Sequence, residues 1–457
     1  MQKMTVKDII DAAGGTLLCG SAEGEIKNVT SDSRKIAEGD LFIPLVGEKF
    51  DGHEFIKAAF DMGAAAALTH KDTDLLLDKT IIKVDDTLKA LGAIAAYYKK
   101  KHPVLTAAVT GSVGKTTTKD MVYAALNSKY NTIKTPNNFN NEIGVPITIF
   151  SIEKEHECAV IEMGMNHFGE IERLVKMGQP QIAIITNIGM SHIENLGSQE
   201  GIFKAKMEIV SDFDENNTLI VNGDDKFLSK TKGTGKYKVV YYGIENPEND
   251  VFAKNIVNKG IEGIEFTARI DNKEYPVRVT QPGIHNVYNA LAAICAGIEF
   301  GVSVEDSIEG IANCEYTSQR LEVEDFHGIQ IINDCYNASP DSVRAALNVL
   351  KTAEGGRKIA ILGDILEMGD YAKDAHYDLG KAVFKSGADM LITAGENAEY
   401  IAKGAIDSGM KAVYAFPKTL DVCSYAKDTV KSGDAVLIKA SHGMRFEEVY
   451  KAIKENQ

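Results

Sequence analysis

The ten residues from Val109 to Thr118, Val-Thr-Gly-Ser-Val-Gly-Lys-Thr-Thr-Thr, constrain the fold of this chain more than any other stretch. An apolar run precedes them at 104–109, and apolar residues recur at helical spacing over 119–127. Glycines let backbone N–H groups converge on anionic oxygens, and the start of a helix adds partial positive charge. The pattern therefore predicts a buried strand, a phosphate-binding loop and a helix.

The order of residue types within this loop favours nucleotide binding over an ordinary strand-to-helix connection. The lysine is placed to reach the outer phosphates, and the hydroxyl after it suits Mg²⁺. The common pattern has a further glycine five residues before the Gly-Lys pair, where this chain has Val109. The expected nucleotide-binding residues of the loop are Gly111, Ser112, Val113, Gly114, Lys115, Thr116 and Thr117.

Length and composition indicate a large globular protein of about three domains, since 457 residues exceed what one core holds. The net charge of -15 argues against nucleic acid or an anionic membrane as partner. Six cysteines without CxxC spacing indicate reduced thiols. The N-terminal residues show no signal-type apolar core, and no apolar run reaches 18 residues, so we expect a cytoplasmic protein without integral membrane contact.

The hydrophobic pattern predicts an α/β fold in three parts. Residues 1–84 combine short strands and helices with frequent glycine turns. Residues 85–315 alternate strands and helices, which implies a mostly parallel sheet around the phosphate loop, with a hairpin insert at 264–279. In residues 316–457 the alternation restarts, with strands expected at 329–332, 358–362, 390–393 and 435–438, so this part reads as an open, Rossmann-like α/β domain.

Two polar residues follow buried strands that belong with the phosphate loop. Glu162 comes directly after the strand at 158–161 and is a candidate ligand for Mg²⁺, the alternative being a solvated carboxylate. His192 follows the strand at 182–185, at the carboxyl edge where α/β proteins bind ligands, although a hydrogen-bonded loop histidine is the commoner case. The residues alone make Lys206 a solvated helix lysine.

Several motifs, in this order along the chain, resemble those of the Mur ligase family, whose members build the peptidoglycan precursor by ATP-dependent amide formation. They are the loop at 111–117, Glu162, His192, the segment Ala-Lys-Met-Glu at 205–208, His-Asn-Val-Tyr-Asn-Ala at 285–290, Gln319-Arg320, and Asp-Cys-Tyr-Asn-Ala-Ser-Pro at 334–340. The resemblance extends through nearly the whole sequence.

The resemblance implies a site for ATP and two Mg²⁺ ions. One ion would lie between Thr116 and Glu162, and the other among Glu162, His192 and a carbamylated Lys206. A carbamate is an anionic oxygen ligand, which suits magnesium where an ammonium would be repelled. It further implies that Asn286 and Asn289 contact adenine, that Asp334 contacts the ribose, and that Arg320 reaches the γ-phosphate, whereas the residues alone suggest a turn former at Asp334 and a surface charge at Arg320. Lys115, Lys206, His192 and Arg320 are the expected catalytic residues.

Within the family, the first and last parts resemble the branch that adds D-alanyl-D-alanine. Ser-Asp-Ser-Arg at 31–34 resembles a uridine-nucleotide site, so Ser33 and Arg34 are expected near the UDP group. Asn140 and Asn141 lie in a loop similar to one that contacts the muramoyl peptide, although such a loop also suits turns. The DNPR-like motif of third-residue ligases is missing, whereas 334–342 and 362–369 with His376 match the dipeptide-adding branch, with Tyr336 and Asn337 at the substrates.

The implied reaction joins D-alanyl-D-alanine to UDP-N-acetylmuramoyl-tripeptide through an acyl phosphate, in an enzyme that we expect to be a monomer. The sequence departs from the pattern usual in this branch at two places, Cys335 and the Ala-Ser-His-Gly-Met segment at 440–444. These departures leave the individual dipeptide contacts open, including those of Lys439, Ser441 and His442. The alternatives are a third-residue ligase, a folylpolyglutamate synthetase, or a regulatory ATPase for which the loop alone would suffice.

Overall fold

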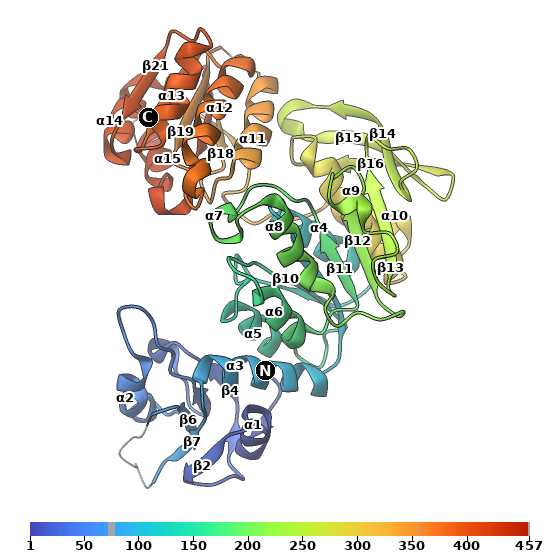
Figure 1. The fold of residues 1–457 in the computed structure, drawn as a ribbon, viewed down its shortest axis with the longest axis vertical. Coiled ribbons are helices and arrows are strands. Elements are labelled where there is room, and N and C mark those ends of the chain that lie inside the picture. Colours follow the sequence, from blue (N-terminus) through green and yellow to red (C-terminus); the bar gives the residue numbers. More distant parts are fainter. Residues whose placement is uncertain (72–77, 355, 456–457) are drawn as a thin grey trace. The chain divides into compact units, whose positions relative to one another are not determined.

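The computed structural model describes residues 1–71, 78–354 and 356–455, and Figure 1 shows their helices and strands. They divide into two compact units. One consists of Met1–Val109, Lys129–Ala183 and Glu208–Asn217, and the other of Thr110–Ser128, Ile184–Met207 and Thr218–Gln457. No helix in the described part of the chain is long and apolar enough to cross a membrane.

The first unit begins with a small five-stranded sheet in the order β2-β7-β6-β5-β4. Strands β7, β6, β5 and β4 are parallel neighbours, and β2 pairs with β7 antiparallel. Phe42, Ile56, Phe60 and Ile81 are among the side chains that fill its core. The elements are α1 (Val6–Ala13), β2 (Thr16–Cys19), β4 (Asn28–Thr30), β5 (Asp40–Phe42), α2 (Ile56–Asp61), β6 (Ala66–Thr69) and β7 (Thr80–Lys83).

The rest of the first unit contains a buried set of parallel strands, with β10 between β8 and β9. Every residue of β10 is buried, as expected for a parallel strand covered on both faces. The Tyr98 hydroxyl of α3 donates to the Ile152 carbonyl at 2.6 Å, which fixes this helix beside the segment after α5. The elements are α3 (Thr87–Lys101), β8 (Leu105–Thr110), β9 (Thr132–Lys134), α5 (Gly144–Phe150), β10 (Cys158–Glu162), α6 (Glu170–Gly178) and β11 (Ile182–Ile185).

In the second unit, β12, β13 and β14 run parallel, and β14, β15 and β16 then pair antiparallel. The last two strands form the hairpin predicted at 264–279, which is confirmed with a tighter turn at Asp271 and Asn272. Within this unit the strand order is β16-β15-β14-β13-β12. The elements are α4 (Lys115–Asn127), α7 (Ile193–Leu196), α8 (Gln199–Met207), β12 (Thr218–Asn222), β13 (Lys238–Gly243), β14 (Val251–Asn258), β15 (Ile264–Ile270), β16 (Lys273–Val279), α9 (His285–Glu299) and α10 (Val304–Ala312).

The C-terminal sheet of the second unit has the order β17-β18-β22-β19-β20-β21 and is parallel except for β17. Ile359 and Ile361 pack with side chains of α14 and α15, and the alternate residues of β19 face the other side, so helices cover both faces (Figure 1). The predicted open α/β arrangement is confirmed. The elements are β17 (Glu322–Phe326), β18 (Ile329–Asn333), α11 (Pro340–Thr352), β19 (Lys358–Gly363), α12 (Ala372–Lys385), β20 (Met390–Ala394), α13 (Ala398–Asp407), β21 (Val413–Phe416), α14 (Thr419–Thr429), β22 (Ala435–Lys439) and α15 (Glu447–Lys454).

The Asp224 carboxylate ties three segments of the second unit together. It accepts hydrogen bonds from the backbone N–H groups of Ile244, Glu245 and Asn246 at 2.6, 2.9 and 3.0 Å, and from the Tyr288 hydroxyl at 3.1 Å. Partial burial opposes ionisation of this carboxyl, but the backbone N–H groups outweigh it and lower the pKa of Asp224.

We predict that Asp224→Asn lowers the free energy of local opening at 244–246 by roughly 1–3 kcal/mol at pH 7, because the bonds lose their charge assistance. A folded pKa below the unfolded one stabilises the protein above the ordinary aspartate pKa of about 4, and this stabilisation is lost as pH falls. Amide hydrogen exchange measures the first effect, and thermal unfolding between pH 7 and 4 measures the second. The exposed Asp11→Asn is the control; equal effects of the two changes would contradict the assignment.

Candidate nucleotide-binding site

The loop between β8 and α4 has the conformation of a phosphate-binding loop. Gly114 precedes α4 in the left-handed region at φ 88° and, as a glycine, supplies no side-chain cap to this helix. The dipole of the helix leaves this end suited to an anion. The predicted order of strand, loop and helix is thus confirmed.

The segment that follows β11 holds the loop in place. The Thr186 hydroxyl and the Asn187 amide both donate to the Val113 carbonyl, at 2.6 and 3.1 Å. The Val113 N–H in turn donates to the Asn187 side-chain oxygen at 3.0 Å. Gly111 has φ 149°, and a Cβ there would lie 1.8 Å from the Thr186 Oγ1. Glycine at position 111 is therefore a steric requirement of this loop.

Lys115 and Thr116 begin α4 at the mouth of the loop. The Lys115 Nζ donates to the Gly111 carbonyl of its own loop at 2.9 Å. Thr116 is buried, with 4% of its surface exposed. The Lys115 side chain is therefore held by its own loop, where a bound phosphate would compete for it.

Lys206 is a buried lysine on α8, with 2% of its surface exposed, and not the solvated lysine that the residues alone indicated. Its removal from water, and then the charge of Lys115, hold the pKa of Lys206 well below its ordinary value. A lysine in this environment is readily a neutral amine, which is the form that adds CO₂.

The two asparagines predicted to contact adenine belong to a chain of hydrogen bonds between α9 and α4. The Thr118 hydroxyl donates to the Asn289 Oδ1 at 3.0 Å, and the Asn289 amide donates to the Asn286 Oδ1 at 2.9 Å. The Asn286 amide donates to the Pro282 carbonyl at 2.8 Å. In the structure these side chains connect the helix after the phosphate loop to the start of α9.

His192 occupies the left-handed region at φ 63°, just before α7. Its Nδ1 lies 2.7 Å from the Glu367 Oε2, and this contact lowers the pKa of Glu367. Sequence reasoning placed Glu367 in a motif but gave it no partner, because the two residues are 175 positions apart.

Glu162 lies in the first unit, at the end of β10, with 1% of its surface exposed. The Asn140 amide donates to its Oε1 at 2.8 Å, and the Glu162 N–H donates to the Thr135 hydroxyl at 3.0 Å. Its Oε2 is buried without a hydrogen-bond partner. A buried carboxylate oxygen without a donor fits a cation. Within the described residues, no three His, Cys, Asp or Glu side chains gather as a metal cluster.

Arg320, Asp334 and Lys439 meet where the chain enters the C-terminal sheet. The Arg320 guanidinium stacks on the Tyr336 ring, 3.8 Å from its centroid, and the Arg320 Nε is buried without a partner. The Lys439 ammonium donates to the Asp334 Oδ2 at 2.6 Å and to the Asn337 carbonyl at 2.8 Å. Burial lowers the pKa of Lys439 although Asp334 opposes this. The pairing shows that Asp334, predicted as a ribose ligand, already has a cationic partner.

The remaining predicted substrate residues lie mainly in the first unit. The Arg34 guanidinium forms hydrogen bonds at 2.8 and 2.9 Å with the Asp32 carboxylate, and Ser33 belongs to the same short 3₁₀ turn. The Asn141 side chain accepts from the N–H groups of Ile143 and Gly144, as in a turn. These bonds are all local, so Arg34 and Asn141 each stabilise the turn in which they lie.

His376, which the sequence placed beside the 362–369 motif, has both ring nitrogens in use. The Ile365 N–H donates to its Nε2 at 2.9 Å, and its Nδ1 lies 2.6 Å from the Ala372 carbonyl. The Leu366 N–H donates to the Ser441 hydroxyl at 2.9 Å. His376 and Ser441 therefore shape the loop that carries Glu367.

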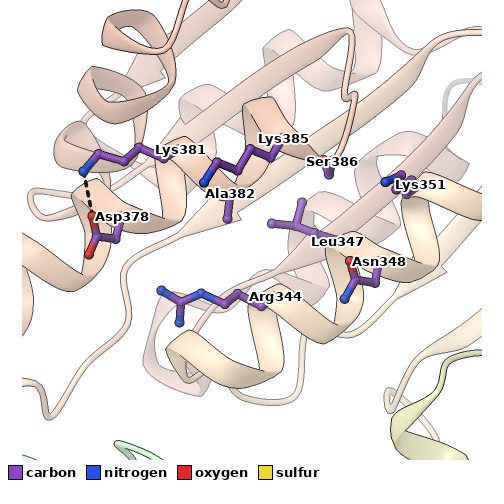
Figure 2. A pocket seen from close by; sticks show the side chains of 9 residues that line it. All are labelled: Arg344, Leu347, Asn348, Lys351, Asp378, Lys381, Ala382, Lys385 and Ser386. Atoms are coloured by element: carbon purple, nitrogen blue, oxygen red, sulfur yellow. Dashed lines mark hydrogen bonds and ion pairs between the residues drawn. The ribbon is translucent and has the colours of Figure 1, made fainter.

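A separate basic pocket of about 520 Å³ lies between α11 and α12. In Figure 2, Leu347 and Ala382 lie between charged side chains from both helices, and Lys381 pairs with Asp378 at 2.9 Å. The residues that line it are Arg344, Leu347, Asn348, Lys351, Asp378, Lys381, Ala382, Lys385 and Ser386. None of them was among the predicted site residues.

The phosphate loop at the end of a parallel strand, followed by an open α/β sheet, defines a nucleotide-binding α/β protein. Comparison with known proteins narrows the class. Mur ligase family models match three segments: the family's catalytic domain at 25–99, the middle domain at 109–297 and the glutamate ligase domain at 319–442.

A UDP-N-acetylmuramoyl-tripeptide–D-alanyl-D-alanine ligase of Bacillus subtilis is 40% identical over 100% of this chain and 99% of its own length. The structure of MurF from Acinetobacter baumannii matches with a TM-score of 0.93 and 31% identity, covering 100% of this chain and 99% of that one. MurF ligase from Thermotoga maritima in complex with ADP matches at 0.84 and 28%, covering 94% and 97%. The chain belongs to the Mur ligase family.

We predict that Gly111→Ala weakens ATP binding at least about tenfold, because the new Cβ clashes with Thr186 and the loop must shift. Titration with a fluorescent ATP analogue measures this. Gly433→Ala is the matched control, since Gly433 also has positive φ, at 93°, but nothing within 4 Å of the added Cβ. Wild-type affinity in Gly111→Ala would show that the loop does not bind the nucleotide in this conformation.

Proposed function

We propose that this protein is an ATP-dependent ligase that joins D-alanyl-D-alanine to UDP-N-acetylmuramoyl-tripeptide. The full-length similarity to the Bacillus subtilis enzyme of that name carries the proposal. Two features of one compact unit support it: the loop before α4, which suits the phosphates of ATP, and Lys206, which is buried although lysines are usually exposed. The three family models support a division into a UDP-binding part at 1–84, an ATP-binding part at 85–315 and a dipeptide-binding part at 316–457.

In the proposed reaction, the tripeptide carboxylate attacks the γ-phosphorus of ATP, forming an acyl phosphate and releasing ADP. The D-alanyl-D-alanine amine then attacks the acyl carbon, the C–N bond forms, and phosphate leaves. Lys115 leaves the Gly111 carbonyl to hold the outer phosphates, and Arg320, whose Nε has no partner, contributes a second cation. Both cations offset charge on the phosphoryl group during transfer.

The proposal includes two Mg²⁺ ions, which would neutralise phosphate charge when bound. Thr116 and Glu162 would hold one ion, and Glu162, His192 and a carbamylated Lys206 the other. The partnerless Oε2 of Glu162 and the depressed pKa of Lys206 support this assignment. Asn140 orients Glu162 through its amide. Asn286, Asn289 and Asp334 would contact the adenosine, and Ser33, Arg34, Asn141, Tyr336 and Asn337 the substrates.

The proposal places the enzyme in the cytoplasm as a monomer. All six cysteines are free thiols, which is the state expected in a reducing compartment. The ligands are then small molecules, with no nucleic acid.

The ligase proposal predicts that ADP formation by the wild-type protein over many turnovers requires both UDP-N-acetylmuramoyl-tripeptide and D-alanyl-D-alanine, because the acyl phosphate must be consumed before the next ATP reacts. With ¹⁸O in the tripeptide carboxylate, the label should appear in the released phosphate, because the acyl oxygen leaves with phosphorus. Parallel incubations replace the dipeptide with diamino acids or glutamate and offer their matching acceptors. Stimulation only by those would indicate a third-residue ligase or folylpolyglutamate synthetase, and acceptor-independent hydrolysis would indicate a regulatory ATPase.

The carbamate assignment predicts a ¹³C NMR signal from a lysine carbamate when the protein is incubated with ¹³C-bicarbonate near neutral pH. Burial lowers the pKa of Lys206, which favours the neutral amine, the form that adds CO₂. Lys206→Ala should remove the signal, whereas Lys204→Ala, an exposed lysine on the same helix, should retain it. A spectrum that is the same for both variants would exclude the carbamate at Lys206.

A further inference from the structure

The segment between α10 and β17, residues 313–321, is called the linker. It is anchored to α4, the helix that follows the phosphate loop. Asp120 lies on α4 and is buried, with 1% of its surface exposed. Its Oδ2 accepts two hydrogen bonds from Thr317, one from the backbone N–H at 2.9 Å and one from the hydroxyl at 2.8 Å. A backbone and a side-chain bond to one carboxylate oxygen fix both the position and the rotamer of Thr317.

A buried carboxylate requires compensation, and α4 supplies it from the preceding residue. The Lys119 ammonium is fully buried and lies 3.4 Å from the Asp120 Oδ1. A charge pair buried in the helix of a nucleotide-binding loop is costly to place there. The Asp120 carboxylate of this pair has a specific partner in the linker, because it accepts both bonds from Thr317.

Two further bonds hold the linker after Thr317. The Arg320 carbonyl accepts from the Gln281 amide at 3.2 Å, and the Leu321 N–H donates to the Asp334 Oδ1 at 3.2 Å. Gln319 and Leu321 have φ of 60° and 48°, so the backbone turns sharply on either side of Arg320. Arg320 thus projects from a short stretch whose two ends are fixed.

We propose that Asp120 and Thr317 are positioning residues that set the place of Arg320 with respect to the phosphate loop. The inference rests on the proposed function, in which the Arg320 guanidinium acts on the transferring phosphoryl group. Asp120 is five residues beyond Lys115 on α4, so the same helix carries the loop lysine and the anchor of the linker. Displacing a charged group by about 1 Å during phosphoryl transfer costs up to about 100-fold in rate.

The test is Thr317→Val, which removes the hydroxyl bond but keeps the side-chain shape and the backbone bond. We expect kcat for D-alanyl-D-alanine-dependent ADP release to fall roughly tenfold, with KM for ATP within about twofold of wild type, since the phosphate loop is untouched. Thr317→Ser keeps the hydroxyl and should retain most of the rate. Thr352→Val is the matched control, because its hydroxyl bonds the Val349 carbonyl at 2.9 Å at the end of α11.

The Arg320→Ala background separates positioning from general stability. If Thr317 acts through Arg320, Thr317→Val has no further effect on kcat in that background; additive losses overturn the proposal, as does equality of Thr317→Val with the Thr352 control. A wild-type protein without dipeptide-dependent ADP release overturns the proposed function instead. Hydrogen exchange at 317–321 then decides the anchor alone: faster exchange in Thr317→Val than in Thr317→Ser supports it, and equal exchange overturns it.

Discussion

The close contact between Gly111 and the Thr186 hydroxyl is the constraint on which the nucleotide site depends. The loop and the segment after β11 approach so closely that any side chain at position 111 would overlap Thr186. That approach lets Thr186 and Asn187 bond the Val113 backbone, which holds the loop open toward its helix. Lys115 is then presented at the start of α4, and its charge, after burial, is the second cause that lowers the pKa of Lys206. Removal of the contact would change the loop conformation, the position of Lys115 and, through the charge of Lys115, the pKa of Lys206.

Burial of charge, more than exposed polarity, distinguishes the groups described here. Lys206, Glu162, Lys439 and the Lys119–Asp120 pair are all nearly inaccessible to water. Burial is expensive unless each charge is neutralised or partnered, so such groups persist in the interior only where a role offsets the cost. Lys439 and Asp120 have found protein partners. Burial lowers the pKa of Lys206, which favours its neutral amine, and Glu162 keeps one oxygen without a donor.

Sequence patterns predicted the strand–loop–helix unit, the hairpin and four strands of the C-terminal sheet, because the local hydrophobic periodicity indicates each of these elements. They did not reveal β17 and β21, which lie at the sheet edges and carry half-exposed, mixed side chains such as Glu-Val-Glu-Asp-Phe. They named the residues of the candidate site, but not their contacts. The bonds from Thr118 to Asn289, from Thr317 to Asp120 and from Lys439 to Asp334 join residues more than 100 positions apart, and sequence spacing carries no signal for them. The buried state of Lys206 likewise depends on tertiary packing.

The positive φ of Leu321 has an energetic consequence for any rearrangement of the linker. A branched, non-glycine residue in the left-handed region carries about 1–2 kcal/mol of strain. Asp334 restrains that residue by accepting its N–H, and Lys439 in turn holds Asp334. A ligand that drew the Asp334 carboxylate toward itself would release Leu321 to an ordinary backbone conformation. The strain free energy released at Leu321 would then offset part of the free-energy cost of rearranging residues 313–321.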